Sequence, residues 1–391
     1  MNTNNSQKGI TIEDILKSHS KVETILCFSH LRWNFVYQRP QHLLTQASKK
    51  YKIYYIEEPI YTDKEDHLGS YDSDNVTVLT PFLTEGIQES SDSAIEKLLK
   101  EKTESLDLKN FISWYYTPMA LNFTEFLKPS LVVFDCMDEL SAFAGAPPEI
   151  IENEKRLIEK ADIIFTGGRS LYESKKDRHE NVYLFPSSID AEHYKKARKK
   201  PDLSKKVKIG YFGVIDERMD LKLLDQISFL KPEWNFEMVG PIVKIDPATL
   251  PQRKNIIYTG QKSYEELPEI IRNWNAAIIP FARNESTEFI SPTKVLEYLA
   301  AEKPVVSTSI RDVVFPYGVN NIVSIADEPH EFVNAIEHLL KNTDVQEWKH
   351  KVEKLLMKTS WQKTWEEMDT IMWSKLQKRN ILKTERNESY V

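Results

Sequence analysis

Apolar runs of four to eight residues alternate with helical patterns along most of the chain, and this alternation most constrains the fold. The clearest helical pattern, at 149–160, ends directly before the apolar run 162–166. Such an alternation predicts a mostly parallel sheet with helices on both faces. The strands predicted for the first half lie at 24–29, 52–56, 76–80, 110–115, 131–135, 162–166 and 182–185.

The pattern breaks once and then starts again. Residues 195–206 are polar, strongly basic and contain a proline, which predicts a solvated inter-domain linker; contact with anionic lipid headgroups is the alternative. Beyond the break, strands are predicted at 207–212, 236–239, 256–259, 276–280, 305–308 and 322–325, and helices at 221–229, 264–273, 292–301 and 329–340. With 391 residues the chain is long enough for two domains, which we place at 1–194 and 207–358.

Residues 359–391 form a last segment, predicted to be a crossover helix and a tail. Its apolar residues recur at spacings of four, three, four and four, as one stripe made of Trp361, Trp365, Met368, Met372 and Leu376. One apolar stripe predicts a helix with a single buried face. Because the stripe follows the second sheet, we expect it to pack back on the first domain and to tie the two domains together.

Composition removes several classes of protein. A net charge of −7 argues against general nucleic-acid binding, which depends on basic surfaces. The two cysteines, Cys27 and Cys136, are too few for a disulfide scaffold or a thiolate metal site, and no His/Asp cluster has metal-ligand spacing. No apolar run approaches the roughly 18 residues that would span a bilayer, and no signal-peptide pattern opens the sequence. We therefore expect a cytoplasmic protein.

Glycine is scarce, so the positions of the 11 glycines are informative. Gly210, Gly213, Gly240 and Gly260 lie in, or at the carboxyl ends of, three consecutive strands of the second half. Ligands bind at this edge of an open parallel sheet, and glycine lets a backbone approach them closely. The second half is therefore expected to hold a ligand.

The segment 289–306 is the strongest local signal. Ser291 is a good N-cap and Pro292 suits the first helical position, which predicts a helix start whose free amides attract an anion. Lys294 adds a positive charge, and Glu297 lies on the same face three residues on. This pattern favours a nucleotide site with phosphate at the helix tip and a carboxylate for a sugar diol. The alternative is a surface helix with solvated charges.

Several motifs together resemble glycosyltransferase family 4, whose members have the GT-B fold. The donor-site resemblance lies in Pro-Thr-Lys at 292–294, Glu-Tyr-Leu-Ala-Ala at 297–301 and Lys-Pro-Val-Val at 303–306. Segments 32–43, 56–59, 135–139 and 209–213 resemble the bacterial branch associated with teichuronic-acid synthesis. The resemblance implies two Rossmann-like domains with parallel sheets that face each other across a cleft, with the nucleotide-sugar mainly on the second.

The resemblance also implies roles on the donor side. Glu297 would hold the ribose hydroxyls, and Thr293 and Lys294 would lie near the pyrophosphate, beside Ser291, Pro292 and Gly213. Val214 stands where the family usually has an arginine, so Arg218, close to the usual lysine position, would act for both. An exposed Arg218 beside acidic residues is the alternative. Base and sugar selectivity would depend on the loops 240–245 and 283–288. Glu288 lies one place early for the family's paired glutamates, and a local shift would bring either Glu288 or Glu285 to the transferred sugar.

The first domain is expected to bind the acceptor. Arg39 opens a helix after the first strand, and Arg32 and Trp33 lie in the loop before it. Asp135 ends a predicted strand and Asp138 follows it, so that either would orient an acceptor hydroxyl. The alternatives are a Trp33 packed in the core, an Arg39 that caps a neighbouring element, and an Asp138 that only caps a helix.

The expected function is therefore that of a retaining, metal-independent hexosyltransferase. It would move a sugar from a UDP- or GDP-sugar, a co-substrate, to a cell-surface glycan or lipid-linked acceptor, with Arg218, Lys294 and Asp138 as the catalytic groups and no bound cofactor. Peripheral contact would place it at the inner face of the membrane. Two alternatives stay open: a non-catalytic protein that binds sugar-nucleotides or glycans, and a nucleotide-sugar epimerase of the same fold.

Overall fold

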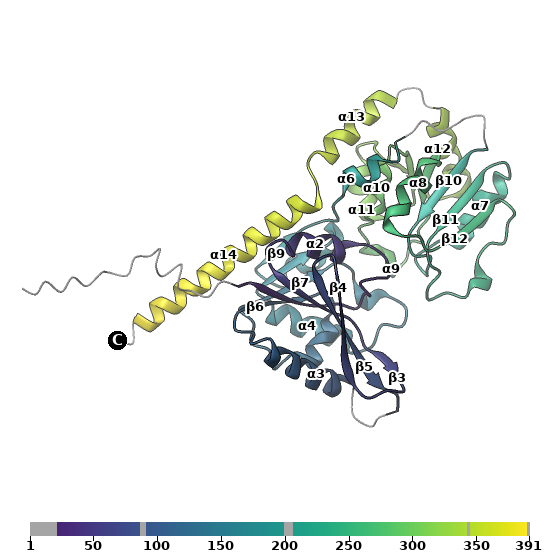
Figure 1. Cartoon of the computed structure of the whole chain (residues 1–391). Helices are drawn as coiled ribbons and strands as arrows, with labels where there is room; N and C mark the ends of the chain where they lie inside the picture. Colours follow the sequence, from purple (N-terminus) through teal and green to yellow (C-terminus); the bar gives the residue numbers. More distant parts are fainter. Residues whose placement is uncertain (1–21, 87–90, 199–205, 342–344, 389–391) are drawn as a thin grey trace, which may run out of the picture.

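Two separate sheets, each built around parallel strands, organise the protein (Figure 1). The computed structural model describes residues 22–86, 91–198, 206–341 and 345–388. Within these residues the first sheet has the strand order β3-β5-β2-β1-β6-β7-β8-β9, with β4 antiparallel to β5, and the second has the order β12-β11-β10-β13-β14-β15. In both sheets the strand order reverses beside the first strand of the domain, at β1/β6 and β10/β13, and such a switch point is where open α/β sheets bind ligands.

All seven strands predicted for the first half are present. The first domain contains β1 (Thr24–Phe28), β2 (Lys52–Ile56), β3 (Ile60–Thr62), β4 (His67–Ser73), β5 (Val76–Thr84), β6 (Phe111–Tyr115), β7 (Leu131–Cys136), β8 (Ile163–Thr166) and β9 (Val182–Leu184). Its helices are α2 (Arg39–Ala47), α3 (Ser91–Ser105), η1 (Pro118–Phe123), η2 (Leu140–Ala142), α4 (Ile150–Lys160), α5 (Arg169–Lys175) and α6 (Ala191–Lys195). Strands β3 and β4 were not predicted, because they are mostly exposed and lack a buried apolar pattern.

The second domain also follows the predicted strands closely. It contains β10 (Lys208–Phe212), β11 (Asn235–Val239), β12 (Ile256–Gly260), β13 (Ala276–Ile279), β14 (Val305–Ser307) and β15 (Ser324–Ile325). Its helices are α7 (Leu221–Leu230), η3 (Pro247–Thr249), η4 (Tyr264–Glu266), α8 (Leu267–Arg272), α9 (Glu285–Glu288), α10 (Lys294–Ala300), α11 (Arg311–Val313), η5 (Val314–Gly318), α12 (Pro329–Lys341) and α13 (Val345–Leu356). The predicted helix at 264–273 is divided into η4 and α8.

The crossing from the first to the second domain is packed on the second. Ile189, Tyr194 and Ala197 are buried in the second domain's core, and Arg198 forms ion pairs with Glu302 and Glu353. Residues 195–198 of the predicted linker therefore continue a packed segment rather than a solvated one. Residues 199–205 lie outside the described part of the chain.

The last helix, α14 (Trp361–Glu388), returns to the first domain (Figure 1). Its five stripe residues, from Trp361 to Leu376, are all buried in the core cluster that includes Ile25 and Trp114 of the first sheet. At the outer edge of this contact, Tyr51 donates a 2.6 Å hydrogen bond to Asp369. The predicted packing of this helix on the first domain is confirmed. No helix in the described residues is both long and apolar enough to cross a membrane.

We predict that Met372→Ala will destabilise the folded protein by about 2–4 kcal/mol, because it opens a cavity where a fully buried side chain joins α14 to the first sheet. Urea unfolding of the full chain measures the effect. Glu367→Ala, at an exposed position of the same helix, is the matched control and should change stability by less than about 0.5 kcal/mol. Equal effects of the two substitutions would contradict a packing role for the stripe.

Candidate active site

A lysine lies directly over a glycine at the switch point of the second sheet. Gly213 follows β10 and has φ 133°, a conformation that favours glycine. A Cβ atom on Gly213 would lie 2.1 Å from Cε and 2.7 Å from Nζ of Lys294. Gly240 supports the same approach from β11, since its Cβ would lie 1.9 Å from the Gly213 carbonyl oxygen. These two glycines of the predicted set thus make room for the lysine.

The end of β10 is tied to the helix that carries Lys294. The backbone N–H of Phe212 donates a 2.9 Å hydrogen bond to the hydroxyl of Tyr298, which is buried on α10. Tyr298 and Lys294 are four residues apart and hence lie near each other along the helix. The position of the ammonium relative to Gly213 is therefore fixed by a buried contact.

The Lys294 ammonium contacts two aromatic rings and has no acceptor among the described residues. It faces the rings of Tyr211 and Phe281 at 5.8 and 5.9 Å, and it forms no ion pair or hydrogen bond with any residue in the described ranges. Burial, together with the charge of Arg218, lowers the pKa of Lys294 to about 8, while nearby carboxylates oppose the shift. An ammonium in this situation would gain from an anionic ligand.

Arg218 is the second cation of the cluster. Its Nε donates to both carboxylate oxygens of Asp216 at 2.9 Å, and its Nη2 donates to Oδ2 at 2.5 Å. Burial lowers the pKa of Arg218, but the hydrogen bonds and charge of Asp216 outweigh it, so that the pKa is raised. Within the described residues, Nη1 has no hydrogen-bond acceptor and remains available to a ligand.

The first domain contributes a loop to this cluster. Asp138 follows β7, and burial raises the pKa of its carboxyl to about 6 although the charges of Arg218 and Lys294 lower it. The ring of Phe143, in the same loop, lies 5.6 Å from the guanidinium of Arg218 and 5.4 Å from the ammonium of Lys244. The structure thus brings Asp138, Arg218 and Lys294, the three residues expected to be catalytic, together from two domains.

Glu297 lies one turn further along α10 and is buried, with 6% exposure. Its Oε1 accepts a 3.1 Å hydrogen bond from the hydroxyl of Tyr194, whereas its buried Oε2 has no hydrogen-bond partner among the residues that the structure describes. Burial raises the pKa of Glu297 to about 7, against the opposing effects of Lys294 and the Tyr194 hydrogen bond. A buried carboxylate oxygen without a donor is costly unless a ligand hydroxyl fills the position.

The start of the Lys294 helix differs from the prediction. Helix α10 begins at Lys294 with Thr293 at the N-cap, so the prediction of Ser291 as N-cap and Pro292 as the first helical residue is wrong. The physical reason is a tertiary contact. A Cβ atom on Gly168 of the first domain would lie 2.7 Å from the Ser291 Cβ, so Ser291 packs across the domain boundary instead of capping the helix. With seven residues, α10 acts through its side chains more than through a helix dipole.

The structure corrects the expected acceptor role of Arg39 and Asp135. Their side chains are 2% and 0% exposed and form an ion pair in which Arg39 donates to both carboxylate oxygens of Asp135 at 2.8–3.1 Å. Arg39 also donates to the carbonyl of Phe185 at 2.8 Å. The pair therefore fixes α2 to β7 and β9 below the cleft and presents no free group to an acceptor.

Trp33 is likewise buried, at 3% exposure, and packs edge-on to Tyr55 rather than offering a face for a sugar. Its backbone N–H donates to Glu57 at 2.7 Å. Arg32 remains partly exposed but binds Glu57 at 3.3 Å and the carbonyl of Pro59 at 3.0 Å. The predicted acceptor loop is thus held by Glu57, which follows β2, and of Arg32 and Trp33 only Arg32 reaches the surface.

Arg283 and Glu288, which were expected to lie near the donor sugar, are outside the cluster of Asp138, Arg218 and Lys294. Arg283 is 55% exposed and forms a 3.2 Å ion pair with Asp327. Glu288 ends α9 and is exposed. Neither contributes to the charges that shift the pKa values of Lys294 and Glu297. No group of three or more potential metal ligands occurs within the residues that the structure describes.

Sequence reasoning missed two groups that shape the site, Tyr194 and Phe143. Tyr194 lies on α6, about 100 positions before its partner Glu297, so no local pattern could have joined them. Phe143 lies in an irregular loop. Asp216 entered the sequence analysis only among the acidic residues beside an exposed Arg218, whereas in the structure it accepts hydrogen bonds from the Arg218 side chain.

Comparison with known proteins agrees with this geometry. Residues 206–342 match the family described as glycosyl transferases group 1. TuaH of Bacillus subtilis (strain 168), named as a teichuronic acid biosynthesis glycosyltransferase, is 24% identical over 251 residues. That match covers 58% of this chain and 63% of TuaH, less than two thirds of the relative's length.

Solved structures extend the likeness to both domains. Sucrose-phosphate synthase from Thermosynechococcus elongatus superposes with a TM-score of 0.69 at 13% identity, over 90% of this chain and 98% of that one. The Escherichia coli trehalose-6-phosphate protein bound with UDP-2-fluoro glucose has a TM-score of 0.67 at 13% identity, over 91% of this chain and 99% of that one. Anabaena HepE in complex with UDP and glucose has a TM-score of 0.62 at 12% identity, over 90% of this chain and 99% of that one.

The fold is therefore that of the GT-B proteins, with two parallel-sheet α/β domains. The chain thus has the GT-B fold, its residues 206–342 are similar to group 1 glycosyl transferases, and it resembles one glycosyltransferase of teichuronic acid biosynthesis.

We predict that Glu297→Gln will stabilise the ligand-free protein above pH 7 and leave it unchanged below about pH 5. The folded-state pKa of Glu297 is raised to about 7 from an ordinary 4.5, so the folded protein binds this proton more tightly than the unfolded chain. Stability linked to this group is thus lost as pH rises from the unfolded pKa to the folded one, and glutamine removes the loss. Thermal unfolding of the variant and of the wild-type protein between pH 5 and 8.5 measures this effect. A stability difference between the two proteins that does not grow with pH would contradict a raised pKa of Glu297.

Proposed function

We propose that this protein is a retaining, metal-independent glycosyltransferase that uses a nucleoside diphosphate sugar. Two groups without partners among the described residues carry the proposal: the Lys294 ammonium over Gly213, and a carboxylate oxygen of Glu297 one helical turn further along α10. The ammonium would bind a diphosphate, and the carboxylate oxygen would accept a hydrogen bond from a ribose diol. UDP is the proposed nucleotide, because the structural relatives from Escherichia coli and Anabaena carry UDP compounds.

In this proposal the second domain holds the leaving diphosphate. As the bond between the sugar and the diphosphate breaks, negative charge grows on the departing phosphate oxygen, and Lys294 and Arg218 Nη1 donate to it. Preorganised donors of this kind commonly contribute 10²–10³ in rate, or about 3–4 kcal/mol. Because Lys294 has a pKa of about 8, it is mostly protonated at neutral pH and gains further proton affinity when the anion binds.

Asp138 is proposed to contact the acceptor side. Its carboxyl enters the cluster from the first domain and titrates near pH 6, so it is largely ionised at neutral pH. It would accept a hydrogen bond from the attacking hydroxyl and orient it toward the sugar. We assign no such role to Arg39 or Asp135. The acceptor is proposed to be a cell-surface glycan or lipid-linked sugar, which rests on the likeness to TuaH, and a cytoplasmic site at the inner membrane face follows from the same proposal.

The full-length protein incubated with UDP-glucose, other UDP-sugars and GDP-sugars, with and without EDTA, tests the proposal. We expect slow release of nucleoside diphosphate that is unaffected by EDTA and faster when an acceptor glycan is present. Binding without release would favour a non-catalytic sugar-nucleotide or glycan-binding protein. An altered sugar still attached to the nucleotide would favour an epimerase.

Glu297→Ala should weaken UDP binding about 10- to 150-fold, equivalent to ~1.5–3 kcal/mol, because the ribose diol loses a charged acceptor. Titration calorimetry with UDP at pH 8 measures it, where Glu297 is ionised. The control is the substitution Glu288→Ala, at an exposed position outside the cluster. The affinity of this variant for UDP should stay within twofold of that of the wild-type protein. An unchanged affinity in Glu297→Ala would remove this residue from the donor site.

A further inference from the structure

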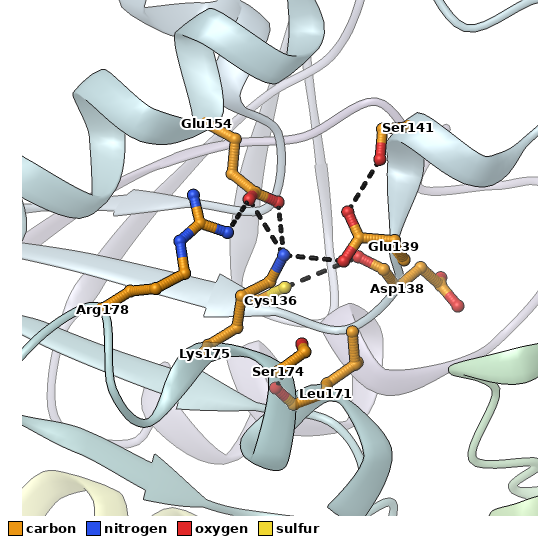
Figure 2. Close-up of polar contacts among 9 residues, drawn as sticks. All are labelled: Cys136, Asp138, Glu139, Ser141, Glu154, Leu171, Ser174, Lys175 and Arg178. Atoms are coloured by element: carbon orange, nitrogen blue, oxygen red, sulfur yellow. Dashed lines mark hydrogen bonds and ion pairs between the residues drawn. The ribbon is translucent and has the colours of Figure 1, made fainter.

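A second buried cation lies in the first domain, behind the loop that carries Asp138. Lys175 ends α5, and its side chain is only 2% exposed. Its ammonium donates to Glu139 Oε2 at 2.6 Å and to both oxygens of Glu154 at 2.9 Å (Figure 2). Three elements therefore meet at one charge: α5, α4 and the loop after β7.

This contact is strong enough to hold a loop. Burial lowers the pKa of Lys175, but Cys136, Glu154 and Glu139 outweigh it and raise the pKa above its ordinary value, so that the ammonium stays protonated. Removing one partner of a buried ion pair leaves an uncompensated charge, which is strongly destabilising locally. The ion pair with Lys175 therefore holds the Glu139 carboxylate in place.

Glu139 lies directly after Asp138 in what we call the cleft loop, residues 137–146. Figure 2 shows the Glu139 carboxylate turned toward Lys175 and the Asp138 carboxyl turned away from it. Cys136 adds a second tie at the base of the loop, where its thiol donates to the Asp138 carbonyl at 3.5 Å. The same loop carries Phe143, which lies over Arg218 and Lys244 of the other domain. Anchoring Glu139 therefore sets where both Asp138 and Phe143 meet the second domain.

The other end of α5 is fixed to the second domain. Asp312 accepts hydrogen bonds from the backbone N–H of Ser170, at 3.1 Å, and from the Ser170 hydroxyl. Arg311 forms an ion pair with Glu173 on the same short helix. Helix α5 thus connects a contact across the domain boundary at its start with the Glu139 anchor at its end.

We propose that Lys175 is a positioning residue: through Glu139 it holds the cleft loop so that Asp138 faces the Arg218–Lys294 pair. The loop-holding part stands on the contacts of the first domain, whereas its effect on turnover rests on the proposed function. Arg178 provides a control within the same network, because it donates to Glu154 at 2.7 Å but does not touch Glu139.

The test compares Glu139→Gln, Lys175→Met, Lys175→Arg and Arg178→Met in the full-length protein. Hydrogen exchange read by mass spectrometry should show about tenfold faster exchange in residues 137–146 for the first two variants and no change there for Arg178→Met. Glu139→Gln leaves Lys175 paired with Glu154, so it remains informative if Lys175→Met does not fold.

Kinetics supply the second readout. With UDP-sugar as donor, Glu139→Gln and Lys175→Met should lower kcat about tenfold with the Kd for UDP unchanged, since the donor-binding groups belong to the second domain. The double variant Glu139→Gln/Lys175→Met should lower kcat no more than either single variant does. Lys175→Arg should have a higher kcat than Lys175→Met. A merely structural role would instead lower stability in all variants without this split.

Unchanged exchange in the cleft loop of Glu139→Gln would overturn the proposal, as would an equal effect of Arg178→Met. If the exchange changes as expected but the wild-type protein cleaves no sugar nucleotide, the proposed function fails while the anchoring of the loop stands. If the wild-type protein is active, and Glu139→Gln and Lys175→Met keep the wild-type kcat despite faster exchange in the cleft loop, the role of Lys175 in positioning Asp138 is overturned.

Discussion

The site depends on a single electrostatic arrangement, the partly buried ammonium of Lys294 above a glycine. Burial moves the pKa of Lys294 down and the pKa values of Asp138 and Glu297 up, so each of the three groups is shifted toward its neutral form. This common direction shows that desolvation outweighs mutual attraction in the ligand-free protein. A diphosphate beside the cations and a diol beside the carboxylate would reverse the imbalance, and ligand binding would then also stabilise the fold.

That arrangement exists only because the two domains are in contact. Asp312 and Ser170 join them on one side. On the other side, Tyr264 stacks between Tyr37 of the first domain and His193 of the crossing segment, with centroid distances of 4.6 and 3.9 Å. A cavity of about 580 Å³ lies beside this aromatic stack, next to Trp361 where the chain crosses back. Loss of the inter-domain contacts would remove Asp138 from the cations and expose Lys294 to water, so domain closure and the electrostatics of the site are coupled.

The sequence predicted what local patterns determine. The buried strands, the α14 stripe and the Gly213–Lys294–Glu297 set follow from periodicity, glycine placement and spacing within one helix. It failed where long-range packing decides. Ser291 packs against Gly168 instead of capping a helix, and Arg39 finds its carboxylate 96 positions away. The β3–β4 extension was missed because backbone pairing with β5, rather than apolar burial, defines these exposed strands. Tyr194 could not be found because its partner lies in another domain's helix.

The distribution of neutralised charges argues for a division of labour between the domains. In the first domain, Arg39, Arg32 and Lys175 each already hold a carboxylate of their own domain. In the second, Lys294 has no such partner within the described residues and Arg218 keeps one nitrogen free. An anionic group therefore gains more on the second domain than on the first. Asp138, the carboxyl that the first domain adds to this cluster, would repel phosphate when ionised and would accept hydrogen bonds from hydroxyls. Under the proposed function, this asymmetry would orient a sugar nucleotide with its diphosphate on the second domain and would direct an acceptor hydroxyl to the first.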